Sequence, residues 1–145
     1  MKKFLFLLFM ILSLNAISTI TYLSIPNMPW LHDISIEGHG LGEQLLFTRG
    51  ENINMTILTD RLDHDITKCV VKIIFKSGIT PYPILNYWNL EYNSFVPNGN
   101  DIRIHIYDII DGDRWPLGLV VMEIYVEDQD GHVIGAAQIN SMLIL

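Results

Sequence analysis

The sequence has few of the residues that build covalent cross-links or catalytic sites. Cys69 is the single cysteine among 145 residues, so no internal disulfide can form and a packed core has to stabilise the fold. The motifs of common catalytic sites are absent too. There is no G-x-S-x-G nucleophile elbow, no glycine-rich phosphate loop, no H-E-x-x-H and no C-x-x-C. We therefore predict a protein that is not an enzyme and has no catalytic residues and no cofactor.

Basic residues are scarce as well. The chain has nine Lys plus Arg against sixteen Asp plus Glu, and two of the nine are Lys2 and Lys3 near the N-terminus. The rest of the chain contains no basic cluster, which argues against nucleic acids and anionic membrane surfaces as partners.

The N-terminal residues have the pattern of a signal peptide. Lys2 and Lys3 precede an uncharged apolar run, Phe4–Leu14, after which small residues return. Ala16 and Ser18 suit the −3 and −1 positions of a signal-peptidase site, which predicts cleavage after Ser18.

This reading divides the chain into three parts. Residues 1–18 are the predicted signal peptide, residues 19–31 a linker, and residues 32–145 a single domain. An uncleaved anchor over residues 4–25 is the alternative, since an uncharged run of that length can span a hydrocarbon core of about 30 Å. Both readings predict an exported domain that is periplasmic, at the cell surface or secreted.

Helical patterning is missing beyond the leader, and apolar residues instead recur at every second position. The clearest runs are Ile53–Ile57, Cys69–Phe75, Ile102–Ile106 and Val120–Val126, with weaker ones at Asp33–Glu37, Tyr87–Tyr92 and His132–Asn140. Successive side chains on a strand point to opposite faces, so each run has one apolar face. Turn dipeptides such as Ser77-Gly78 and Asp111-Gly112 separate the runs. About seven strands of this kind predict an all-β, antiparallel, immunoglobulin-like sandwich.

One turn carries acidic residues that also suggest a calcium loop. Asp130-Gly131 lies between two predicted strands, and Asp-Gly supplies the positive φ angles of a tight hairpin. Asp128-x-Asp130-Gly131 matches the start of an EF-hand loop, but its twelfth position is Ile139, which cannot ligate calcium. We therefore predict a turn that only reverses the strand.

A second acidic group lies in the segment TDRLDHD, which contains Asp60, Asp63, His64 and Asp65. Carboxylates with an imidazole suit several divalent metals, yet such a group is more often a solvated loop. We predict no metal site. A cluster of His64 with two carboxylates within ligand distance would instead favour a metal-handling protein.

Cys69 belongs to the inward-facing series of its predicted strand. It shares a face with Val71 and Ile73, whereas a reactive thiol needs an electropositive and partly exposed setting. We predict a buried, inert thiol.

Aromatic residues are concentrated in the segment PYPILNYWNLEYNSF. Tyr and Trp are enriched in binding hot spots, so the candidate binding residues are Tyr82, Tyr87, Trp88 and Tyr92. Tyr87 and Trp88 are adjacent and should face opposite ways on a strand, and Trp88 could be the tryptophan that such sandwiches bury between their sheets. Core packing and an exposed binding platform both remain open for this segment. Trp115, just before a proline, is predicted to lie in the core.

Two stretches resemble extracellular immunoglobulin-like modules of prokaryotes, including macroglobulin-type domains. They are FTRGENINMTI (Phe47–Ile57) and PLGLVVMEIYVEDQDGHVIG (Pro116–Gly135). The resemblance implies an adhesive, spacer or assembly module without catalytic residues. The chain departs from that pattern between Ser77 and Asp101, which is longer and more aromatic than a plain connection.

Two functions follow as hypotheses. The first is an exported, non-enzymatic module that binds another envelope or extracellular protein or assembles at the cell surface. The alternative is a carbohydrate-binding module with an aromatic platform in residues 82–95. A flat, apolar edge strand would favour the first, and exposed aromatic rings in one plane would favour the second.

Overall fold

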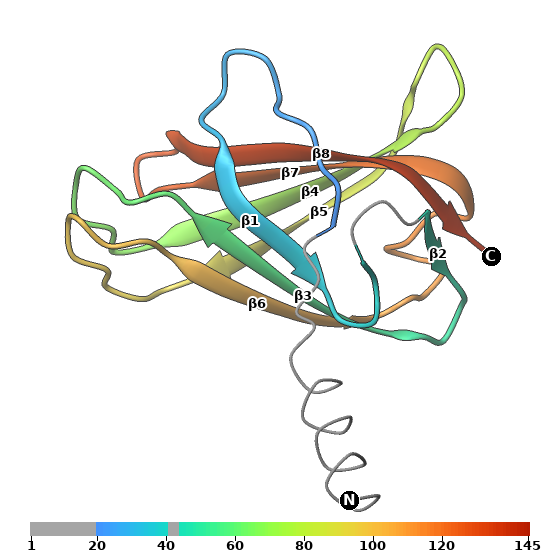
Figure 1. The fold of residues 1–145 in the computed structure, drawn as a ribbon, viewed down its shortest axis with the longest axis horizontal. Coiled ribbons are helices and arrows are strands. Elements are labelled where there is room, and N and C mark those ends of the chain that lie inside the picture. Colours follow the sequence, from blue (N-terminus) through green and yellow to red (C-terminus); the bar gives the residue numbers. More distant parts are fainter. Residues whose placement is uncertain (1–19, 41–43) are drawn as a thin grey trace, which may run out of the picture.

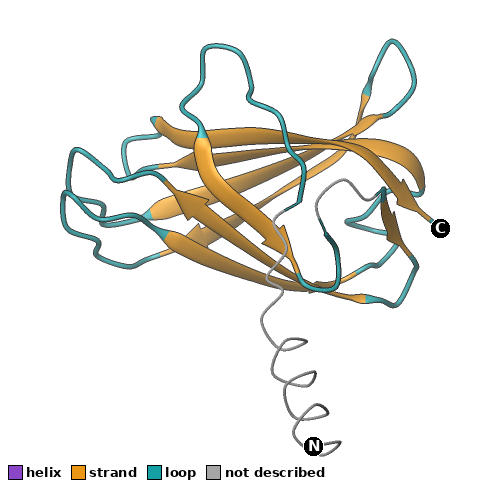
Figure 2. Cartoon of the chain, in the orientation of Figure 1, coloured by secondary structure: helices purple, strands orange, loops and turns teal. Residues whose placement is uncertain are grey.

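The computed structural model describes residues 20–40 and 44–145, and these form eight β-strands (Figures 1 and 2). The strands are β1 (Leu31–Ile36), β2 (Leu45–Phe47), β3 (Asn52–Thr59), β4 (Cys69–Ser77), β5 (Ile84–Tyr92), β6 (Arg103–Ile109), β7 (Gly118–Glu127) and β8 (Val133–Ile144). Within these ranges no helix is long and apolar enough to span a membrane. The predicted signal peptide lies outside the described residues.

The strands form two sheets that face each other (Figure 1). One sheet has three strands in the order β1-β3-β6, and the other has five in the order β2-β8-β7-β4-β5. Neighbouring strands are antiparallel, except that β2 pairs in parallel with the end of β8. The all-β prediction is confirmed for the described residues, and the paired sheets fit a β-sandwich.

The alternating apolar residues point into the space between the sheets. On β4 they are fully or almost fully buried, and the same holds for the inward-facing residues of β3 and β7: Ile53, Met55, Ile57, Cys69, Val71, Ile73, Phe75, Val120, Met122, Ile124 and Val126. Burying each large aliphatic side chain is favourable by about 1.5–3 kcal/mol. This shared core is what holds the two sheets together.

Trp115 is the tryptophan buried between the sheets. Its ring lies 5.0 Å from that of Phe75 and 6.4 Å from that of Phe47, measured between centroids. Its Nε1 donates a hydrogen bond of 2.9 Å to Asp108 Oδ2, which satisfies the one polar atom of the buried ring. The core position predicted for Trp115 is confirmed. Trp88, the other candidate for burial between the sheets, is only half-buried.

Residues 20–30 pack on the sandwich, although we expected a linker there. Ile20 belongs to the core, and Leu23 exchanges two backbone hydrogen bonds of 2.8 Å with Gln138 of β8. Ala136 donates a third backbone bond of 2.8 Å to Pro29. Residues 20–30 are therefore part of the folded domain, because their backbone satisfies the outer edge of β8.

Candidate functional site

β5 is an edge strand that only β4 pairs with among the described residues. The register sets Trp88 opposite the buried Ile73 and Tyr87 opposite Ile74. Trp88 therefore faces the core, and Tyr87 faces outward with 69% of its surface exposed. Ile84 and Leu85 are exposed beside it, so the strand presents an apolar outer surface next to an unpaired edge.

The four candidate binding residues are divided between two faces. Tyr82, in the loop before β5, and Tyr87 are exposed. Trp88 and Tyr92 are half-buried and pack against the core. The aromatic segment thus contributes both to packing and to the surface, and its side chains do not all lie in one plane.

Trp88 is covered by the segment that links β6 to β7. The guanidinium carbon of Arg114 lies 5.9 Å from the Trp88 ring centroid, in a cation–π contact. Asn86 Nδ2 donates to the backbone oxygens of Asp113 and Arg114, at 2.6 and 3.0 Å. Trp88 Nε1 is buried without a hydrogen-bond partner in the described part of the chain. These contacts close one end of the gap between the two sheets.

Tyr92 occupies the other end of that gap, between β5 and β6. Its hydroxyl donates a long hydrogen bond of 3.4 Å to His105 O. Beside it is a hollow of about 380 Å³, lined in part by Cys69 and Ile102. Burial raises the pKa of the Cys69 thiol, and Cys69 is 4% exposed. The predicted burial of this cysteine is confirmed.

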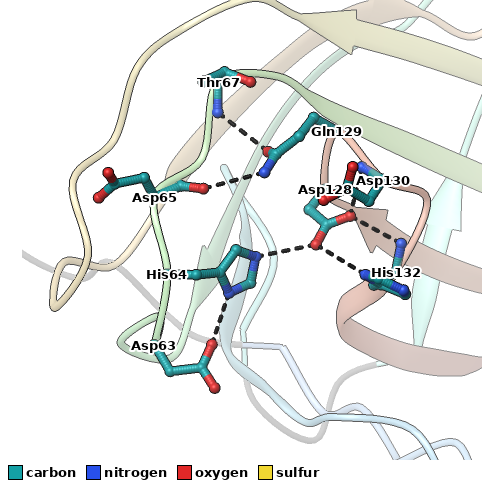
Figure 3. Close-up of polar contacts among 8 residues, drawn as sticks. All are labelled: Asp63, His64, Asp65, Thr67, Asp128, Gln129, Asp130 and His132. Carbon is teal, nitrogen blue, oxygen red and sulfur yellow. Dashed lines mark hydrogen bonds and ion pairs between the residues drawn. The ribbon is translucent and has the colours of Figure 1, made fainter.

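The β7–β8 hairpin is built around the carboxylate of Asp128 (Figure 3). Asp128 Oδ1 accepts the backbone N–H groups of Asp130 and His132, each at 2.9 Å. Gly131 has the positive φ angle predicted for it, 80°. The turn therefore reverses the strand as expected, and the Asp128 side chain itself holds it in shape.

Asp128 Oδ2 points toward His64, from the connection between β3 and β4 (Figure 3). His64 Nε2 lies 3.0 Å from Asp128 Oδ2, and His64 Nδ1 lies 2.7 Å from Asp63 Oδ1. The bond to Asp63, followed by the bond to Asp128, raises the pKa of His64. Burial opposes ionisation of Asp128, but the two amides and His64 outweigh it, so the pKa of Asp128 is lowered. Both ring nitrogens of His64 can therefore act as donors to carboxylates.

His132 joins the same group from the hairpin. Its Nδ1 lies 3.6 Å from Asp128 Oδ2, and ligand atoms of Asp128, Asp130 and His132 all lie within 4.8 Å of one another. His64 itself has two carboxylates within reach, Asp63 at Nδ1 and Asp128 at Nε2, and a cluster of this kind was expected to favour a metal-handling protein. Sequence reasoning treated the two acidic segments separately, because residues 64 and 128 are brought together only by the fold.

Comparisons with known proteins extend to the fold and no further. No protein-family model and no curated protein matches the chain. Among solved structures, it is similar to chicken MD-1 complexed with lipid IVa, with a TM-score of 0.55 and 10% identity over 81% of this chain and 83% of that one. It is also similar to Spo0M, a sporulation control protein from Bacillus subtilis, with a TM-score of 0.50 and 12% identity over 77% of this chain and 47% of that one. At these identities the likenesses show a shared β-sandwich fold.

Proposed function

We propose that this protein is an exported, non-enzymatic, immunoglobulin-like module that binds another envelope or extracellular protein through the edge of β5. The observation that carries the proposal is the nine-residue edge strand, with its exposed apolar residues Ile84, Leu85 and Tyr87. A long, apolar and unpaired edge is a template for pairing with another strand.

The backbone of β5 supports strand addition. Tyr87 N–H is engaged by its neighbour's side chain, Asn86 Oδ1, at 2.9 Å, which indicates that it points away from β4. By the alternation of an antiparallel pair, the N–H of Asn89 points to the same free side. A partner strand would gain main-chain hydrogen bonds there, and the exposed side chains would provide specificity.

Charge along β5 also favours an apolar contact. Glu91 is the one charged residue of the strand, and Lys68 Nζ lies 3.1 Å from its carboxylate. The edge strand β6, by comparison, carries Arg103 and Asp108. A strand without net charge at its centre imposes a small desolvation cost when a partner covers it.

Carbohydrate binding is the second candidate, and the position of the rings favours it less. Only Tyr82 and Tyr87 of the four residues are exposed, while Trp88 and Tyr92 turn toward the core. The similarity to chicken MD-1 complexed with lipid IVa supports a ligand-binding use of a sandwich of this shape. In this chain, side chains such as Trp115 and Phe75 occupy the core between the sheets, and the hollow beside Tyr92 is about 380 Å³.

Site-specific photo-crosslinking tests the proposal. A photoreactive phenylalanine analogue replaces Tyr87 on β5 or, as a matched control, Tyr107 on β6, which is also an exposed tyrosine on an edge strand. In cells, we expect a discrete protein adduct from position 87. Asn89→Pro should abolish this adduct by blocking strand addition, whereas Asn89→Ala should retain it. Equal adducts from both positions, unaffected by Asn89→Pro, would refute binding through β5.

Export is a separate part of the proposal. The basic start, the apolar run and the small residues before Thr19 support cleavage after Ser18. Intact-mass measurement of the protein from the cell envelope should give a chain that begins at Thr19. A mass that retains residues 1–18 would mean a membrane anchor instead.

A further inference from the structure

We propose that His64, Asp128, Asp130 and His132 form a binding site for a divalent transition metal of the zinc class. The four residues come from two segments far apart in sequence: the β3–β4 connection and the β7–β8 hairpin (Figure 3). The site is distinct from the β5 edge and does not depend on the function proposed for it.

Donor spacing is the first argument for this site. Zn²⁺ binds imidazole nitrogen and carboxylate oxygen at about 2.0–2.2 Å in a tetrahedron, so neighbouring donors should lie about 3.3 Å apart. Asp128 Oδ2 lies 3.0 Å from His64 Nε2 and 3.6 Å from His132 Nδ1. Asp130 offers a carboxylate oxygen within 4.8 Å of the ligand atoms of Asp128 and His132. The three donors of the hairpin are therefore already grouped, and His64, whose Nε2 contacts Asp128, would join them as the fourth donor when its side chain turns toward the ion.

The second argument is that the central ligand is held in place. The Asp128 side chain is 1% exposed, and two backbone N–H groups fix its Oδ1 at 2.9 Å. This leaves Oδ2 directed at the two imidazoles. A carboxylate that is oriented before the ion arrives loses little conformational freedom on binding.

Asp63 provides a third and independent argument. A histidine that ligates a metal almost always donates its other ring nitrogen to a carboxylate or carbonyl, which fixes the ring and raises its basicity. His64 Nδ1 has such a partner in Asp63 Oδ1, at 2.7 Å. Asp63 therefore already holds the His64 ring at Nδ1, and Nε2 faces the proposed metal position.

The two segments are also tied together beside the proposed site (Figure 3). Gln129 accepts a hydrogen bond from the Thr67 backbone N–H and donates one to Asp65 O, both at 3.2 Å. This tie holds the hairpin against the β3–β4 connection, so the two segments that carry the proposed ligands lie side by side. A metal ion would reinforce this tie, and the exposed His132 leaves the site accessible from solvent.

The donor set selects the class of ion. Imidazole nitrogens suit Zn²⁺ and its transition-metal neighbours, whereas Ca²⁺ takes six to eight oxygen ligands. With two imidazoles and two carboxylates the site should prefer Zn²⁺ over Ca²⁺. Bound metal takes the place of the proton between His64 and Asp128, so binding should weaken in acid.

The test is a titration of the purified, chelator-stripped chain with ZnCl₂ or CaCl₂, followed by calorimetry and thermal unfolding. We expect one Zn²⁺ per chain and a rise in melting temperature with Zn²⁺ but not with Ca²⁺. His64→Gln and His132→Gln should each weaken Zn²⁺ binding at least about 10-fold, as loss of a ligand exceeds the loss of its supporting partner. His105→Gln is the matched control, because His105 is an exposed histidine on β6, and it should bind Zn²⁺ like the parent chain.

A second readout keeps the test independent of folding. Imidazole ¹⁵N resonances of His64 and His132 should shift on adding Zn²⁺, and those of His105 should not. The hairpin should survive His132→Gln, since the backbone N–H of residue 132 makes the bond to Asp128. Absence of saturable Zn²⁺ binding, binding unchanged in both variants, or an equal response to Ca²⁺ would each overturn the proposal.

Discussion

The two sides of the sandwich are closed in different ways. On the closed side, formed by β1, β8 and residues 20–30, backbone groups at the sheet edges find partners. Leu23 and Pro29 bond to β8, and β2 pairs with the end of that strand (Figure 1). On the open side, formed by β5 and β6, no described strand pairs with either edge, and the gap is covered mainly by side chains such as Trp88 and Tyr92.

We infer from this difference that the closed side mainly stabilises the domain, whereas the open side is the part that can bind a partner. Backbone groups that are paired on the closed side cannot recruit another strand, whereas those on the open side can. Substitutions on the closed side should therefore lower the free energy of unfolding, while substitutions of the exposed residues on the open side should change binding and leave stability almost unchanged. The following predictions test that division, from the largest expected effect to the smallest.

Leu31→Ala should destabilise the protein by about 2–5 kcal/mol, as other large-to-small core substitutions do. Leu31 is fully buried at the start of β1, on the closed side. Leu85→Ala on β5 is the control, and because its side chain is exposed it should change the free energy of unfolding by less than about 0.5 kcal/mol. Urea denaturation measures both, and equal costs would show that the two sides are not different.

Gly135→Ala should lower the free energy of unfolding by about 1–3 kcal/mol, because the added methyl group overpacks the core. A Cβ built on Gly135 of β8 would lie 2.4 Å from Cδ2 of Leu31, so the buried Leu31 side chain or the two strands would have to shift. Combining Gly135→Ala with Leu31→Ala should recover part of the loss, because the smaller side chain leaves room for the new methyl group. Purely additive costs in urea denaturation would contradict a direct contact between these residues.

Cys69→Ser should destabilise by about 1–3 kcal/mol, since it buries a hydroxyl without a secured partner. Cys69 lies next to the hollow on the open side, so its thiol also reports how often that side opens. Its buried position and raised pKa predict slow reaction with thiol reagents in the native protein and fast reaction after denaturation. Rapid labelling of Cys69 in the native protein would mean that the side chains covering the open side do not exclude the reagent.

Tyr87→Lys should have the smallest effect on stability, within about 0.5 kcal/mol, because the side chain is solvent-exposed. The same substitution places a charge at the centre of the free edge and should abolish partner binding. Circular dichroism and urea denaturation check the first expectation, and co-purification with the crosslinked partner checks the second. If the Tyr87→Lys variant binds the partner as the parent chain does, the β5 edge is not the contact surface.

Sequence reasoning was most accurate where structure depends on neighbouring residues. The period-two runs became β3, β4, β6 and β7 within a few residues of their expected bounds. It missed β2, which has only three residues and forms by pairing with residues 142–144. It also took residues 20–30 for a linker, because nothing local reveals that β8 offers them an edge.

The sequence by itself determined the all-β class, the inward-facing side of each long strand, the burial of Cys69 and the Asp130-Gly131 turn. Each of these depends on alternation or on backbone preference over a few residues. Only the tertiary structure decided which edges are paired, that Trp88 is only half-buried, and that His64 meets Asp128 across 64 positions of sequence. Such contacts depend on how the two sheets pack, and no short stretch of sequence contains that information.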